Sequence, residues 1–169
     1  MRLSKVISII IHPIFMPFIA LYLSLKLIPT IGLAITNYLN FIYLVLLFST
    51  IILPLISVLF LIKKKQVSSL EMNDYNERST PLFITAIWMC YGYYKLMDIL
   101  AFAPILKVGL IGTIVIVFIG SVISKFWKIS LHMLAIGGVV GMFFSLNILF
   151  GGLLKVIVPS VLSAGILGV

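Results

Sequence analysis

Charged residues are scarce in this chain of 169 residues, of which only 9% are charged and 63% are hydrophobic. A soluble domain of this length would carry roughly a quarter charged residues to cover its surface. The shortage excludes an ordinary soluble domain and indicates a protein embedded in a membrane. Lys and Arg outnumber Asp and Glu by 12 to 4, but they stand at the ends of apolar runs. That placement indicates contact with anionic lipid headgroups rather than with nucleic acid.

Thiols and potential metal ligands are scarce as well. The one cysteine, Cys90, lies inside an apolar run, so no intrachain disulfide can form, and its thiol is expected to pack as a small apolar group. The chain has two histidines, and three of its four acidic residues fall in one loop. This composition predicts neither a metal site nor a cofactor.

Long apolar runs occupy most of the chain and predict an all-α fold, a polytopic bundle of about six transmembrane helices in one domain, residues 1–169. A helix needs about 20 apolar residues to cross a hydrocarbon core ~30 Å thick. The last run, from Val156 to Val169, has only 14 residues and is too short to span. We therefore expect the chain to be a fragment that stops within its sixth helix. The first five helices are expected at 6–25, 38–62, 81–103, 105–124 and from the 125–128 turn to about 150.

Several positions within these helices carry local predictions. Pro81 suits the first turn of a helix, with Ser79 or Thr80 as its N-cap. Lys95 and Asp98 lie one turn apart and are expected to pair. His12, in the first helix, serves either as an interfacial residue bonded to a backbone carbonyl or as a buried functional group. Close helix packing is expected at three glycines of the fifth helix, Gly137, Gly138 and Gly141.

Basic residues are distributed unevenly between the two ends of the predicted helices. One side carries eight of them and the other carries four, and the positive-inside rule assigns the richer side to the cytoplasm. The prediction is a multi-pass protein of the cell (inner) membrane with a cytoplasmic N-terminus. Because two helices separate them, Arg78 and the segment 125–132 fall on the same side of the membrane. The richer side comprises Arg2, Lys5, Lys63, Lys64, Lys65, Arg78, Lys125 and Lys128.

The segment 125–132, Lys-Phe-Trp-Lys-Ile-Ser-Leu-His, gathers polar groups between two apolar runs. Lys128 and His132 are four residues apart and are expected to share one face at the start of the fifth helix, with Ser130 between them. A helix N-terminus favours an anion, Arg78 can grip a phosphate through two nitrogens, and Lys128 adds a point charge. His132 can donate a proton to a leaving oxygen. The combination predicts a site for a lipid phosphate. The alternative is a set of ordinary interfacial side chains.

The segment 128–132, followed by two glycines at 137 and 138, resembles the second motif of a divergent bacterial branch of the type 2 phosphatidic acid phosphatase superfamily. The usual form of that motif is Pro-Ser-Gly-His. Ser130 and His132 match it, and Leu131 replaces the glycine.

The segment 74–81, Asp-Tyr-Asn-Glu-Arg-Ser-Thr-Pro, resembles the first motif of the same family, which has a lysine, six residues and then Arg-Pro. Arg78 matches the arginine, and the proline follows three residues later at Pro81. Glu71 stands in the place of the lysine, whose role Lys128 or one of the lysines at 63–65 could take. The opening His12-Pro13, with Pro17, also resembles this branch.

The resemblance implies a metal-independent membrane lipid phosphatase acting on phosphatidic acid, a polyprenyl diphosphate or a similar lipid. It implies that Arg78, Lys128 and Ser130 hold the phosphoryl oxygens and that His132 protonates the leaving group. In the family's third motif, an arginine is followed by the histidine that attacks phosphorus. No arginine follows Arg78 and no histidine follows His132 in these 169 residues. The expectation is a fragment that lacks this motif or an inactive member.

Two other functions fit parts of the sequence. A non-catalytic membrane protein, such as a transporter subunit or a scaffold, would suit the intramembrane pair Lys95 and Asp98. A transferase acting on prenyl diphosphates would normally need two aspartate-rich motifs for magnesium, which Asp74 and Asp98 alone do not supply.

Overall fold

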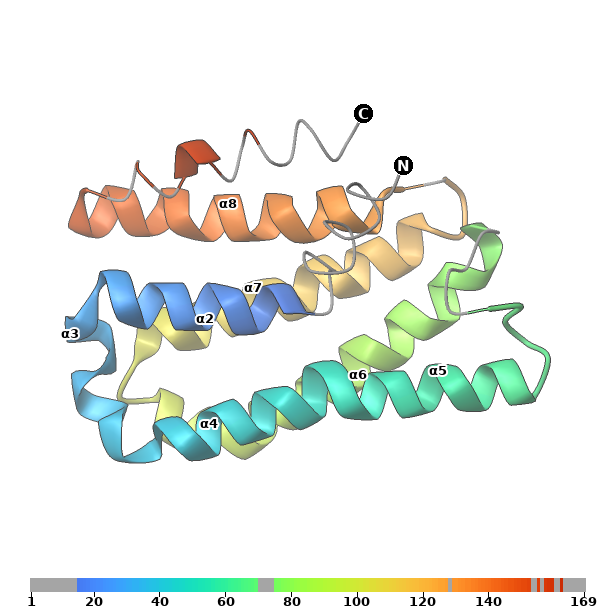
Figure 1. Cartoon of the computed structure of the whole chain (residues 1–169), viewed down its shortest axis with the longest axis horizontal. Helices are drawn as coiled ribbons and strands as arrows, with labels where there is room; N and C mark the ends of the chain where they lie inside the picture. Colours follow the sequence, from blue (N-terminus) through green and yellow to red (C-terminus); the bar gives the residue numbers. More distant parts are fainter. Residues whose placement is uncertain are drawn as a thin grey trace, which may run out of the picture. The chain divides into compact units, whose positions relative to one another are not determined.

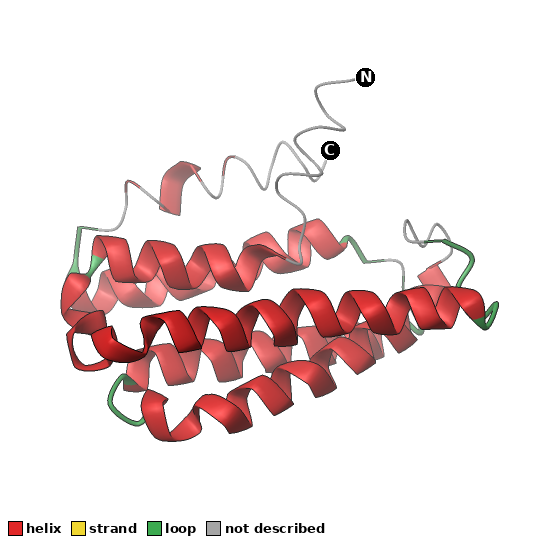
Figure 2. Cartoon of the chain, turned by 60° about the horizontal axis from the view of Figure 1, so that its bottom comes forward, coloured by secondary structure: helices red, strands yellow, loops and turns green. Residues whose placement is uncertain are grey.

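The computed structural model describes residues 15–69, 75–127, 129–152, 155, 157–159 and 162, and the side chains of 75 and 76 are not among those described. His12, Glu71 and Lys128 therefore lie outside the described residues. These residues form helices and connecting loops without a strand (Figure 2), as the composition predicts. The chain divides into two compact units. Unit 1 contains Met1–Leu33 and Ser130–Val169, and unit 2 contains Ala34–Ile129.

Three helical segments of the described chain are long and apolar enough to cross a membrane. They are Pro29–Lys63, Pro104–Ile123 and Leu131–Phe150, with 35, 20 and 20 residues. The described part of the first expected helix, α2 (Met16–Leu27), is shorter, at 12 residues. The helix α6 (Ser79–Leu100) has 22 residues but carries three tyrosines, Lys95 and Asp98 in its second half. The described part of the chain is thus helical and has three candidate membrane spans, whereas the sequence predicts about six.

The stretch 26–37, which lies between the first two expected helices, is largely helical. The short α3 (Pro29–Gly32) leads into the 3-10 helix η2 (Leu33–Tyr38) and then into α4 (Leu39–Leu46). Pro29 can begin a helix because the N–H it lacks would have no partner in the first turn. The chain from this proline to Ile62 carries no charged residue, so the apolar run begins earlier than position 38.

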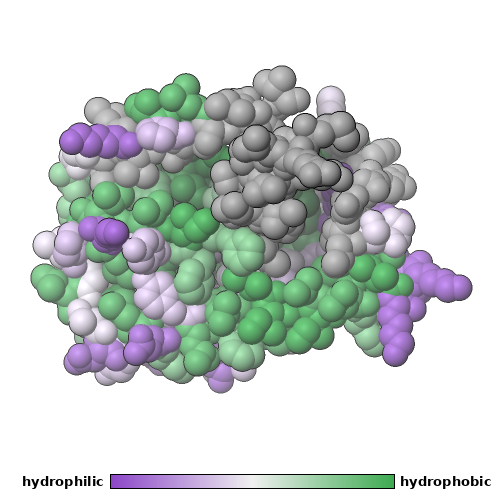
Figure 3. Space-filling view, in the orientation of Figure 1, coloured by the Kyte–Doolittle hydropathy of each residue, from purple (hydrophilic) through white to green (hydrophobic). Residues whose placement is uncertain are grey.

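A π-helical turn, η3 (Leu47–Ile52), joins α4 to α5 (Leu53–Lys63). It lies directly before Pro54, whose ring would clash with the carbonyl four residues earlier in a regular α-helix. Within this turn the Thr50 hydroxyl donates to the Leu46 carbonyl at 2.8 Å. The wider turn accommodates the proline and leaves the helix continuous. The surface of this part of the chain is largely hydrophobic (Figure 3).

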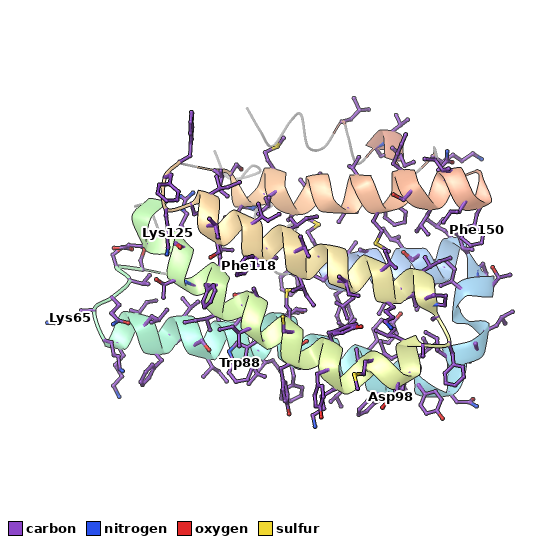
Figure 4. The ribbon with its side chains drawn as sticks, turned by 180° about the vertical axis from the view of Figure 1, so that it is seen from behind. Lys65, Trp88, Asp98, Phe118, Lys125 and Phe150 are labelled. Carbon is purple, nitrogen blue, oxygen red and sulfur yellow. The ribbon has the colours of Figure 1, made fainter. Side chains whose placement is uncertain are left out.

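The helix α6 is the central element of unit 2. It packs against α4, η3 and α5 on one side and runs alongside α7 (Pro104–Ile123), as Figures 1 and 4 show. Phe83 and Phe118 pair between α6 and α7, with ring centroids 5.9 Å apart. Both helices begin and end within three residues of their predicted bounds. The predicted N-cap is wrong, because Arg78 occupies that position and no side chain caps the helix.

The predicted pairing of Lys95 with Asp98 is not formed. The Lys95 ammonium instead lies over the rings of Tyr91 and Tyr94, 5.5 and 5.8 Å from their centroids. The electron-rich faces of the two rings attract the cation on the exposed surface of α6. The sequence spacing puts the Asp98 carboxylate within reach of Lys95, but in the structure the ammonium group contacts the two tyrosine rings instead.

In unit 1, α2 packs against α8 (Leu131–Phe150). The Ser24 hydroxyl is buried on α2 and donates to the Ala20 carbonyl at 2.6 Å. The predicted close packing is not seen at Gly137 or Gly141, because a Cβ there would meet no described atom within 4 Å. Close approach is found instead in unit 2, at Gly92 on α6, where a Cβ would overlap Ser49 of η3.

Candidate functional site

Arg78 and Ser79 attach the start of α6 to the end of α7 and to the turn that follows it. The 3-10 helix η4 (Tyr75–Arg78) leads directly into α6 and presents Arg78 as a half-buried side chain. Arg78 donates from Nη1 to the carbonyl oxygen of Ile129 at 3.1 Å. The buried Ser79 hydroxyl donates to the Ser121 carbonyl at 2.8 Å. The polar loop and the segment 125–132 therefore meet at Arg78 and Ile129, both within unit 2.

Glu77 accounts for a second fixed contact in the same loop. One carboxylate oxygen, Oε2, accepts hydrogen bonds from the backbone N–H and the hydroxyl of Ser68, at 2.9 and 2.8 Å. The two residues are nine positions apart, and their contact joins the loop after α5 to η4. The Glu77 carboxylate is thus hydrogen-bonded to an uncharged residue of the same loop.

Ser124 is a buried residue directly after α7, between the two carbonyls that accept hydrogen bonds from Ser79 and Arg78. It lies one turn beyond Ser121 and five residues before Ile129, and its side chain is 0% exposed. Its Oγ has no hydrogen-bond partner among the described residues. Several helical hydroxyls donate to the carbonyl four residues earlier, as Thr85 does to Pro81 and Thr113 to Gly109. Ser124 departs from that pattern.

Ser130 and His132 lie at the start of α8, in unit 1. Ser130 is the N-cap of this helix, and its Oγ accepts from the backbone N–H of Met133 at 3.4 Å. The bond uses the oxygen as an acceptor, so the hydroxyl proton can still be donated to a ligand. His132 is the second residue of α8 and is half-buried.

The predicted helical face shared by Lys128 and His132 is not supported. Lys128 lies outside the described residues, and α8 begins only at Leu131. A spacing of four residues aligns two side chains only where both stand in one helix. Of the four predicted site residues, the structure thus describes Arg78, Ser130 and His132, and it connects Arg78 to the carbonyl just before Ser130.

Sequence reasoning missed three features of this region. Ser79 was expected to cap α6 but bonds to α7, Ser121 supplies the accepting carbonyl, and Ser124 is buried. The sequence offers one signal for them, which is the spacing of Ser121 and Ser124, two hydroxyls one turn apart at the end of a largely apolar helix. Among the described residues, no three His, Cys, Asp or Glu side chains gather in a way that could hold a metal ion.

Comparisons of this chain with models of protein families, with curated proteins and with solved structures return no match.

Proposed function

We propose that this protein is an integral-membrane lipid phosphatase that hydrolyses a lipid phosphate or a polyprenyl diphosphate. Arg78, Lys128 and Ser130 hold the phosphate group, and His132 donates a proton to the oxygen of the leaving group. The observation that carries the proposal is the hydrogen bond from Arg78 to the carbonyl of Ile129. It joins two stretches 51 residues apart, which are the same two stretches that resemble the phosphatase motifs.

The membrane setting supports a lipid substrate. Three helices of the described chain could cross a bilayer, and their polar ends would lie at the level of the lipid headgroups. The finer topology is part of the proposal: about six spans, with the N-terminus and the site on the cytoplasmic side of the inner membrane. The eight basic residues predicted on that side support this orientation.

The chemistry follows from charge. Hydrolysis develops negative charge on the phosphoryl oxygens and on the leaving oxygen. Arg78 and Lys128 offset the charge on the phosphoryl oxygens. His132 offsets the charge on the leaving oxygen by transferring its proton as the phosphorus–oxygen bond breaks. Water supplies the oxygen of the released phosphate, and the lipid leaves as an alcohol or a monophosphate. The reaction also needs a nucleophile for phosphorus, and no described residue is assigned that role.

A non-catalytic membrane protein is the second candidate, and one observation favours it. The Arg78 guanidinium bonds to the Ile129 carbonyl, and the Ser130 hydroxyl caps α8 through Met133. Both bonds are of the kind that structural side chains make at helix ends. In that case the cluster would stabilise the turn, or bind a lipid headgroup without cleaving it.

The test is phosphate release by the full-length protein in vesicles that contain phosphatidic acid or a polyprenyl diphosphate. We expect His132→Ala to lower the rate by about 10²- to 10⁴-fold, which is the usual contribution of a general acid. Arg78→Ala should lower it by about 10²- to 10³-fold, and Arg78→Lys by less, because lysine keeps the charge and loses the two-nitrogen grip. Lys95→Ala, a change far along α6, serves as the matched control.

Thermal unfolding with and without phosphatidic acid completes the test. If the wild-type protein releases no phosphate but phosphatidic acid still stabilises it more than phosphatidylcholine does, the non-catalytic function replaces the phosphatase. If His132→Ala is folded and turns over at the wild-type rate, the assignment of His132 is wrong.

A further inference from the structure

The end of α5 contains a lysine where the backbone geometry favours glycine. The Gln66 N–H donates to the Leu61 carbonyl at 3.0 Å, and the Lys65 N–H donates to the Ile62 carbonyl at 2.9 Å. These two bonds form a Schellman motif, which requires a left-handed residue after the helix. Lys65 is that residue, with a φ of 58°. Glycine normally occupies this position because a Cβ is crowded there.

The chain uses glycine elsewhere for the same backbone conformation. After α8, Gly151 and Gly152 adopt φ values of 70° and 74°. Among the described residues, Lys65 alone combines a side chain with a positive φ. The end of α5 is therefore less stable with this lysine than it would be with glycine, because a Cβ is crowded in the left-handed conformation.

Four exposed lysines gather at this end of unit 2. Lys63, Lys64 and Lys65 end α5, and Lys125 follows α7. Figure 4 shows Lys65 and Lys125 at the same end of the unit, with Asp98 at the opposite end. We call these four lysines the basic rim.

No lysine of the basic rim pairs with a carboxylate in the described part of the chain. Glu77, the acidic residue of the adjoining loop whose side chain the structure describes, accepts hydrogen bonds from Ser68. The Lys64 ammonium lies 4.6 Å from the centroid of the Phe60 ring, one turn back along α5. Within the described residues, the positive charge of the rim is thus exposed on the surface and not neutralised by a carboxylate.

Aromatic side chains accompany the basic rim. Phe126 and Trp127, directly after Lys125, are 78% and 75% exposed. Large aromatic rings beside lysines at the ends of apolar helices are characteristic of the level of lipid headgroups. The exposed apolar side chains of α5, such as Leu59 and Phe60, continue from the rim toward the hydrocarbon core.

We propose that the basic rim binds the anionic headgroups of phospholipids in one leaflet, and that Lys65 contributes its charge to this binding from a left-handed backbone conformation. The combination of outward lysines, exposed aromatics and apolar helices directly below fits a lipid surface. The proposal uses neither His132 nor Arg78, so it stands whether or not the protein hydrolyses phosphate.

The experiment uses the full-length protein in phosphatidylcholine nanodiscs that contain traces of dansyl-labelled phosphatidylglycerol or dansyl-labelled phosphatidylcholine. Energy transfer from Trp127 to the label reports the lipids near the rim, and a Trp127→Phe sample gives the background from Trp88. The wild-type protein should enrich phosphatidylglycerol over phosphatidylcholine around Trp127. The enrichment should fall as salt is raised from about 0.01 M to 0.15 M, because the Debye length shortens from ~30 Å to ~8 Å.

Lys65→Gly is the decisive variant because it should move two measurements in opposite directions. Removal of the strain should raise the resistance of the protein to unfolding. Removal of the charge should lower the phosphatidylglycerol enrichment by about fivefold at low salt, the equivalent of about 1 kcal/mol per lysine near an anionic membrane surface. Lys125→Gln should give a similar loss of enrichment without the gain in stability.

Lys95→Gln, near the opposite end of α6, is the matched control and should leave the Trp127 signal unchanged. Equal enrichment in wild type, Lys65→Gly and Lys125→Gln would overturn the proposal, as would equal loss of both labelled lipids. An enrichment that does not respond to salt would also contradict it, because binding would then not depend on the charge of the rim.

Discussion

Gly92→Ala should separate two helices at the centre of unit 2. A Cβ built at Gly92 would lie 2.6 Å from the Cβ of Ser49 and would also overlap its hydroxyl oxygen. Nonbonded carbons are attractive at about 3.5–4.0 Å, so α6 and η3 must move apart locally by roughly 1 Å. Overpacking of this kind typically costs about 1–3 kcal/mol of unfolding free energy.

The clash has a specific remedy in Ser49. Ser49→Gly removes both the hydroxyl and the Cβ, which leaves room for the new methyl group, whereas Ser49→Ala keeps the Cβ that clashes. Ser49→Gly alone should cost about 1 kcal/mol, because glycine is unfavourable within a helix. The double variant Gly92→Ala with Ser49→Gly should therefore be more stable than the sum of the two single changes by at least about 1 kcal/mol.

The measurement is reversible unfolding in mixed micelles by titration with SDS, followed by far-ultraviolet circular dichroism. A double-mutant cycle then gives the coupling energy between positions 49 and 92. Ser49→Ala in the Gly92→Ala background is the control, and it should restore little of the lost unfolding free energy because it keeps the Cβ of residue 49. Additive effects in the cycle, or an equal rescue by Ser49→Ala, would refute the assignment of this close approach.

Two further changes test a buried hydroxyl and a half-buried indole by the same titration. Ser124→Ala should stabilise the protein by about 1 kcal/mol or more, because it removes a fully buried hydroxyl that has no described partner; a loss of stability would show that the hydroxyl is engaged. Trp88→Phe should cost about 1 kcal/mol, because it removes the hydrogen bond of 2.9 Å from the indole N–H to the Ser57 hydroxyl. Ser57 would keep its own bond to the Leu53 carbonyl, so a much larger cost would point to lost packing of the ring instead.

The candidate site was predictable in part. Residue type and spacing pointed to Arg78, Ser130 and His132, and the pairing of the two polar stretches follows from an even number of helices between them. The geometry was not predictable, because Arg78 and Ser79 both bond to backbone carbonyls. A carbonyl is present at every residue, so no sequence pattern marks which one will accept the bond.

The sequence by itself determined that this protein is helical and carries segments able to cross a membrane. A run of apolar residues must satisfy its backbone internally, and its length fixes whether it can span, so both properties are local. The starts of α6, α7 and α8 were also close to prediction, because prolines and polar residues mark them in the chain.

Only the tertiary structure decided which faces of these helices meet. Lys95 is a local case, because Tyr91, Tyr94 and Asp98 all stand on α6 with it and its ammonium lies over the two rings. Gly92 of α6, by contrast, lies against Ser49 of η3, a residue from another part of the chain. Such contacts between helices depend on the free energy of the whole arrangement and leave no signal in the spacing of the residues.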